Sequence, residues 1–126
     1  MDYVESALPP LTFVDVENIL RICRQKRRKA SFIHGGSKEA MRTMKDILYG
    51  EPTIGHRIIN AIEELEAEKQ VRLLQLMIFG RSADISLHSA ELEAKSIDPS
   101  SIARYMSEKR LFQYITRGMQ RIDRIM

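Results

Sequence analysis

Apolar residues recur every three or four positions along most of the chain, which is the spacing of one face of an α-helix. The first stripe lies in the segment that begins TFVDVENIL, and Thr12 with Asp15 fits a capping box at its start. The stripe consists of Phe13, Val16, Ile19, Leu20 and Cys23. Residues 1–11 contain Pro9 and Pro10, which favour an extended conformation. We therefore expect an N-terminal arm over residues 1–11 and a single helical domain over residues 12–126.

Three further helices are expected in the middle of the chain. Ser37 predicts a helix through about Tyr49, which Gly50 and Pro52 would end. The next two cover about residues 54–66 and 67–79, and no Gly or Pro separates them, so one continuous helix over 54–79 is equally open. The segment VRLLQLMIF is apolar on nearly every side, which is typical of a helix in the centre of a domain.

The glycine that follows this apolar segment predicts its end. Gly80 is expected to adopt the left-handed conformation that commonly follows a helix. Asp84 is then expected to cap a helix through about Ser96. The inward-facing residue of that helix is expected to be Ile85, His88 or Leu92.

Two helices are expected towards the C-terminus. Asp98 followed by Pro99 is a typical helix start. The last helix carries an apolar stripe and tolerates Gly118 at about 1 kcal/mol relative to alanine. The stripe consists of Leu111, Phe112, Ile115, Met119 and Ile122. No strand-length alternation is found, so the pattern predicts an all-α fold, a compact, orthogonal or irregular bundle of five to seven helices around the central apolar helix at about 67–79.

Composition and charge narrow the class of protein only slightly. The 126 residues are 44% hydrophobic, with a net charge of +3 and a single cysteine, Cys23, which excludes an intrachain disulfide. The start MDYVESALPP has no basic and apolar signal-peptide pattern, and no apolar run is long enough to cross a membrane. We therefore expect a cytoplasmic protein without membrane contact.

Three segments carry a resemblance to a known family. They are MRTMKDILYGEPTIGHRIINAI, VRLLQLMIFGRSAD and IARYMSEKRLFQYITRGMQRI, within about residues 40–122. Together they resemble a bacterial all-helical family of uncharacterised proteins, a domain of unknown function in which a leucine-rich helix ends in Leu-Gly-Arg-Gly-Asp. This chain has Phe79 where the family tends to have Trp, and Ser82 where the motif has its second glycine. The resemblance implies a helical, cytoplasmic, bacterial protein and brings no activity.

Arg81 and Asp84 form one candidate site. A cation fixed at the end of a rigid helix, with a carboxylate three residues on, can bind an anion or a partner side chain. The favoured interpretation is structural: Arg81 covers the last carbonyls of one helix and Asp84 caps the next.

Basic residues on the first and last helices form a second candidate site. If these helices lie side by side, the two rows merge into a patch that can bind nucleic acid or another anionic partner. The residues are Arg24, Arg27, Arg28, Lys29, Arg117, Arg121 and Arg124. The alternative, which is commoner for such rows, is two solvated helix faces.

No catalytic motif and no metal or cofactor motif is found in the sequence. His34, His56 and His88 share no ligand spacing, HGGSKEA lacks the spacing of a P-loop, and the EELEAE carboxylates are expected to be solvated. The sequence therefore favours a non-enzymatic interaction protein without a cofactor, which binds a protein partner or itself as a homodimer through an apolar helical face near the C-terminus. A nucleic-acid-associated accessory protein is the alternative, and small-ligand or anion binding at Gly80–Asp84 is a second one.

Overall fold

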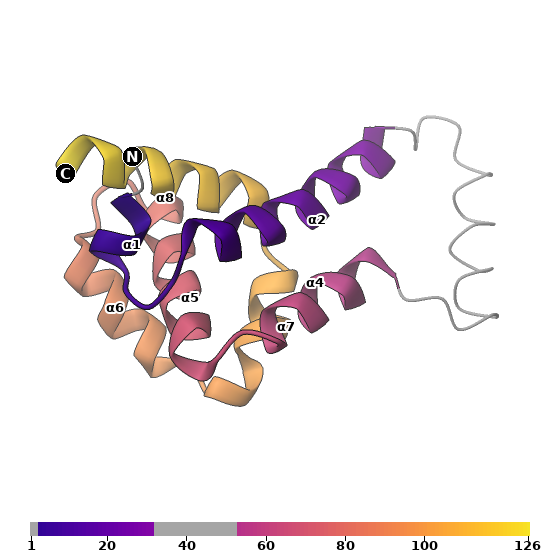
Figure 1. Ribbon diagram of the computed structural model, residues 1–126, viewed down its shortest axis with the longest axis horizontal. Coiled ribbons are helices and arrows are strands. Elements are labelled where there is room, and N and C mark those ends of the chain that lie inside the picture. Colours follow the sequence, from indigo (N-terminus) through magenta and orange to yellow (C-terminus); the bar gives the residue numbers. More distant parts are fainter. Residues whose placement is uncertain (1–2, 32–52) are drawn as a thin grey trace.

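The computed structural model describes the backbone of residues 3–31 and 53–126 and the side chains of residues 3–24 and 53–126. Helices account for all regular structure in this part of the chain, so the all-α prediction is confirmed (Figure 1). The elements are α1 (Tyr3–Ala7), α2 (Phe13–Ser31), α4 (Ile54–Glu63), α5 (Ala67–Arg81), α6 (Leu87–Ser96), the 3-10 helix η2 (Pro99–Ser101), α7 (Ile102–Ser107) and α8 (Leu111–Ile125). Residues 54–79 thus belong to two helices, and the helix expected over 37–49 lies outside the described residues.

The central helix is α5, as its apolar sequence predicts. Every residue from Leu73 to Gly80 is buried, since α8 and α6 pack against different sides of α5 (Figure 1). The remaining helices extend this core, with α2 beside α4 and α4 against α7. The buried side chains of α4 are Ile58 and Ile62, four residues apart on one face.

The N-terminal residues are not the extended arm that the two prolines suggested. Tyr3–Ala7 form α1, which lies beside the C-terminal part of α8 (Figure 1). Val4, Leu8 and Leu11 are buried in the core, at spacings of four and three residues. Burial of these three apolar side chains outweighs the preference of Pro9 and Pro10 for an extended chain, because it removes a large apolar area from water.

Two helix starts predicted from local sequence are confirmed. The Thr12 amide donates to Asp15 Oδ2 and the Asp15 amide donates to Thr12 Oγ1, each at 3.1 Å, which is the reciprocal pattern of a capping box. Asp98 accepts from the Ser100 amide at 3.0 Å, with Pro99 as the first residue of η2. These starts depend only on residues two or three positions apart.

The prediction that Gly80 ends the central helix is wrong. The glycine is needed there because α5 packs closely against α8. Gly80 lies inside α5, which continues to Arg81, and its backbone does not adopt the left-handed conformation. A Cβ atom here would overlap the carbonyl oxygen of Tyr114, and one at Gly118 would lie 2.5 Å from the carbonyl oxygen of Leu76. The two glycines therefore allow the backbones of α5 and α8 to approach closely.

Helix α6 also differs from the expectation. Ser86, rather than Asp84, is its N-cap and accepts from the Ser89 amide at 3.0 Å. Its buried residues are Ala90 and Ala94, whereas His88 and Leu92 face solvent. Of the three expected inward residues, Ile85 alone packs against the core, and it lies before α6 begins. Small alanines on the inner face let α6 lie close to α5, which a search for large apolar residues does not reveal.

Candidate functional site

Arg81 and Asp84 do not come together as an anion site. Arg81 Nη2 lies 2.6 Å from Glu93 Oε1 and Nη1 donates to the Tyr105 hydroxyl at 3.1 Å. The hydrogen bond with Glu93 is the main cause that raises the pKa of Arg81. Asp84 is exposed in the loop before α6. Arg81 therefore joins α5 to α6 and α7 rather than presenting its charge to a ligand.

Arg121 is turned inward, away from the basic row in which the sequence placed it. Its Nη1 donates to the carbonyl oxygens of Phe79 and of Ser82, the latter at 2.8 Å, and its Nη2 donates to that of Ile85 at 2.9 Å. The guanidinium also stacks on the Phe79 ring, 3.7 Å from the centroid. A residue of α8 thus satisfies the carbonyls at the end of α5 and along the loop that follows it.

The other described residues of the predicted basic patch stay exposed, on helices α2 and α8, which pack against each other. Arg24 lies 4.0 Å from Glu17 and 5.8 Å from the centroid of the Phe112 ring, near the start of α8. Arg117 and Arg124 are exposed further along α8. The side chains of Arg27, Arg28 and Lys29 lie outside the described residues.

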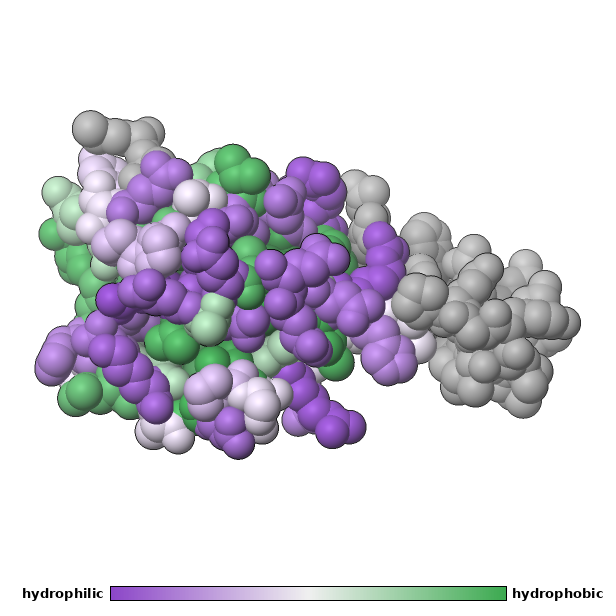
Figure 2. All heavy atoms as spheres, turned by 60° about the horizontal axis from the view of Figure 1, so that its bottom comes forward, coloured by the Kyte–Doolittle hydropathy of each residue, from purple (hydrophilic) through white to green (hydrophobic). Residues whose placement is uncertain are grey.

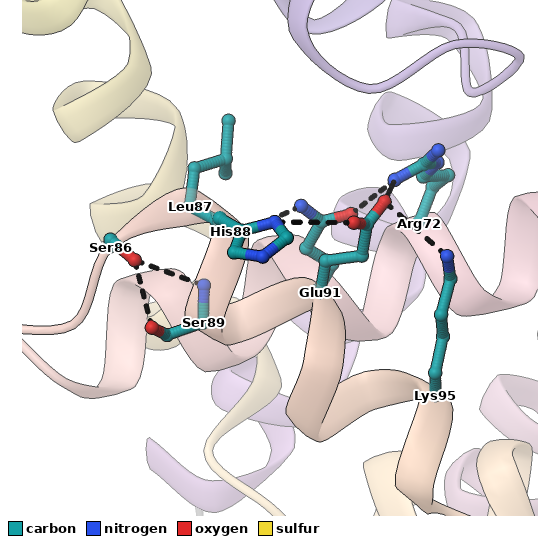
Figure 3. Close-up of polar contacts among 8 residues, drawn as sticks. Arg72, Ser86, Leu87, His88, Ser89, Glu91 and Lys95 are labelled. Atoms are coloured by element: carbon teal, nitrogen blue, oxygen red, sulfur yellow. Dashed lines mark hydrogen bonds and ion pairs between the residues drawn. The ribbon is translucent and has the colours of Figure 1, made fainter.

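Arg72 organises a polar network that the sequence did not indicate. It donates to the Pro9 carbonyl at 3.1 Å, to Gln75 Oε1 at 2.8 Å and to Glu91 Oε2 at 2.6 Å. Gln75, the buried polar residue of α5, also donates to the Leu87 carbonyl at 2.9 Å. Figure 3 shows Arg72 in contact with Glu91. This hydrogen bond is the main cause that lowers the pKa of Glu91. The network fastens the N-terminal segment and α6 to α5, so its role is structural.

A groove of about 820 Å³ lies beside the start of α8 in the described part of the chain. Its apolar lining comes from α2, α4 and α8, and its polar lining comes from the α7–α8 connection and the outer side of α8. The apolar residues are Cys23, Ile58, Leu111 and Phe112, and the polar ones are Glu108, Lys109, Arg110, Gln113, Thr116, Arg117 and Gln120. We call this feature the α8 groove.

The α8 groove carries more positive than negative charge. Lys109, Arg110 and Arg117 line it together with one carboxylate, Glu108, among the described residues. Lys109 Nζ lies over the Tyr105 ring, 4.7 Å from its centroid. No ion pair joins Arg110 or Arg117 to a carboxylate in the described part of the chain. The sequence pattern does not reveal this site, because its residues come from three helices and, of its three cations, only Arg117 belongs to a recognisable row.

Comparison with known proteins finds no matching family model, no matching curated protein and no matching solved structure. Among the described helices, none combines the length and apolar character needed to cross a membrane.

The apolar face near the C-terminus, where the sequence places a partner, is formed by α8. The stripe of α8 is used by the core, where Leu111, Ile115 and Ile122 are buried. Ile125 and Met126 remain exposed at its end, at 60% and 56%. Figure 2 brings the lower side of Figure 1 forward. On this face, hydrophobic residues lie in separate areas between hydrophilic ones. Most of the apolar side of α8 is therefore used by the core, whereas Phe112 at its start stays partly exposed and lines the α8 groove.

The described histidines, acidic residues and cysteine form no metal site. His56 lies beside Thr53, with Nδ1 3.2 Å from its hydroxyl oxygen, and His88 lies 3.7 Å from Glu91 at the surface of α6. His34 lies outside the described residues. The EELEAE carboxylates are exposed, as expected, and Cys23 is buried in the core.

Proposed function

We propose that this chain is a non-enzymatic helical interaction domain that binds a segment of another protein in the α8 groove. The observation that carries the proposal is the groove itself, about 820 Å³ of space with apolar residues from three helices along its base. Concave sites that combine apolar lining with a few polar groups are typical binding sites in proteins.

The burial of the lining residues indicates the strength of binding. Ile58 and Leu111 are already almost completely buried. A bound segment would therefore gain apolar contact chiefly with the aliphatic stems of Arg117 and Lys109, and with the part of the Phe112 side chain that stays exposed beside Arg24. Such a limited gain in buried apolar area suits a transient partner rather than a permanent subunit.

A screen of random peptides tests this proposal without knowledge of the partner. Peptides of about 16 residues, displayed on phage, are selected on the wild-type protein and then tested on the variant Thr116→Trp, whose indole would fill the groove. The matched control is Asp123→Trp, which adds the same side chain to an exposed position of α8 outside the groove. Peptides that bind the wild type and Asp123→Trp but not Thr116→Trp support the proposal. A selection that yields only peptides indifferent to Thr116→Trp contradicts it.

Homodimerisation is the form of this proposal in which a second copy of the chain is the partner. Light scattering across protein concentration measures it directly. A dimer that persists in Asp123→Trp and dissociates in Thr116→Trp would place the second copy in the groove.

Nucleic-acid binding is the second candidate. The observation in its favour is that Arg110 and Arg117 pair with no carboxylate among the described residues. Phosphate binding by such cations weakens steeply with salt. Light scattering with a mixed single- and double-stranded oligonucleotide, at low and moderate salt, tests it. A complex that forms at low salt and dissociates as salt rises supports this candidate, whereas a protein indifferent to oligonucleotide contradicts it.

The bacterial origin, the cytoplasmic location and the relationship to the uncharacterised family belong to this proposal as well. They are supported by the three sequence segments quoted above.

A further inference from the structure

We infer that the α8 groove selects an acidic segment, one in which carboxylates flank the apolar residues that enter the groove. This inference rests on the proposed function and adds the chemistry of the partner. It follows from the charge of the groove, from the spacing of that charge and from the position of the start of α8.

The charge of the groove is available to a partner. Elsewhere in the described chain, Arg72 and Arg81 are each paired with a glutamate at 2.6 Å. Arg110 and Arg117 are both exposed and have no such partner among the described residues. A carboxylate that approaches them therefore gains attraction without first displacing an internal ion pair.

The spacing of the two arginines favours a peptide over a small amphiphilic molecule. Arg110 is the N-cap of α8 and Arg117 lies seven residues further, which is about 10 Å along a helix axis. One charged head group reaches only one of them. Two carboxylates seven residues apart on a helical peptide, or three apart on an extended one, span about the same distance.

The start of α8 adds to the positive potential. Residues 110–113 line the groove, and no side chain caps the first turn of this 15-residue helix. The positive end of the helix dipole therefore lies beside the arginines, where it favours a negatively charged group. Glu108 works against this effect, so the preference depends on the three cations Lys109, Arg110 and Arg117 outweighing it.

The peptides selected above provide the test. Groove-dependent peptides are sequenced, and the tightest is synthesised with a fluorescein label for anisotropy titrations. The protein variants are Arg110→Gln with Arg117→Gln, which neutralises the groove, and Arg104→Gln with Arg124→Gln, which removes the same charge from exposed positions outside it. Far-UV circular dichroism confirms that both are folded.

The inference predicts enrichment of Asp and Glu beside apolar residues in the selected peptides. The groove-neutralised protein should bind the labelled peptide roughly ten-fold more weakly, since two exposed ion pairs are lost. The control pair should change affinity less than about two-fold, because its charges lie further from the peptide.

Three other outcomes would overturn the inference. Groove-dependent peptides that are neutral or basic would leave the proposed function standing and overturn the acidic preference. Equal weakening in both variant pairs would show a response to net charge alone and would also overturn it. Tight binding of a 20-nucleotide oligonucleotide that is lost only in the groove-neutralised protein would show that the groove cations bind phosphate. This result would overturn the assignment of a peptide to the groove.

Discussion

Replacing Arg121 by methionine tests the assignment of this side chain to the core. Methionine keeps much of the aliphatic stem and its contact with the Phe79 ring, but it removes the guanidinium. The carbonyl oxygens of Phe79, Ser82 and Ile85 then lose a charged donor. If Arg121 instead belonged to a solvated basic row, the same substitution would leave stability almost unchanged.

The expected loss of stability in Arg121→Met follows from the three hydrogen bonds and the ring contact of the guanidinium. A hydrogen bond to a charged group contributes about 1.5–3 kcal/mol when it is well buried. Arg121 is only partly buried, so water can replace part of this hydrogen-bond energy at the Ser82 and Ile85 carbonyls. The stacking contact adds about 1 kcal/mol, part of which the methionine sulfur restores. We expect Arg121→Met to lower the free energy of unfolding by about 2–4 kcal/mol, and Arg121→Lys by about half as much.

Urea denaturation followed by far-UV circular dichroism measures this change by linear extrapolation. The control is Arg117→Met, on the same helix but exposed, for which a change within about 0.5 kcal/mol is expected. Hydrogen exchange adds a local readout, because amides of the loop at 82–86 should exchange faster in Arg121→Met. Equal stability of the two variants would refute the assignment of Arg121 to the end of α5.

Three further substitutions test other contacts. Gly118→Ala should destabilise by about 1–3 kcal/mol in urea denaturation despite its better helix propensity, because the new Cβ would lie 2.5 Å from the Leu76 carbonyl oxygen; a gain in stability would contradict the close packing of α5 and α8. Leu8→Ala should cost about 2–5 kcal/mol in the same assay, since this side chain is completely buried; a neutral result would show that the N-terminal segment does not pack on the core. In the folded protein, Arg72 lowers the pKa of Glu91 below its ordinary value of 4.5, so the folded state binds this proton less tightly than the unfolded state. The contact therefore contributes stability above pH 4.5. This stability is lost as the pH falls from 4.5 through the pKa of Glu91 in the folded state. Urea midpoints measured from about pH 6 to about pH 3 should therefore fall less steeply in Glu91→Gln than in the wild type, and parallel curves would contradict this.

The sequence predicted those parts of the fold that depend on neighbouring residues. Thr12 and Asp15 satisfy each other across one turn, and Asp98 acts on the amide two positions ahead, so both helix starts could be recognised locally. The apolar helix at 67–79 was also clear, because every residue from Leu73 to Phe79 is buried. Gly80 was misinterpreted because the reason for a glycine there is the backbone of Tyr114, which is distant in sequence.

The candidate sites were harder to predict because side-chain partners are set by the tertiary fold. A basic row along α8 looks uniform in sequence, yet Arg117 faces solvent while Arg121 binds carbonyls 36 to 42 residues away. Arg81 was recognised as important, but its partner is Glu93 rather than the nearer Asp84. The α8 groove could not be found at all, since it exists only where three helices meet.

The way Arg121 holds the loop between α5 and α6 has a consequence for how this chain can vary. Its guanidinium contacts only main-chain oxygens there, which every amino acid possesses. Ala83 and Asp84 are exposed and contribute no side chain to this contact. The identity of these two positions can therefore drift over evolutionary time while the path of the loop stays the same, and they are suitable places for attaching a spectroscopic label.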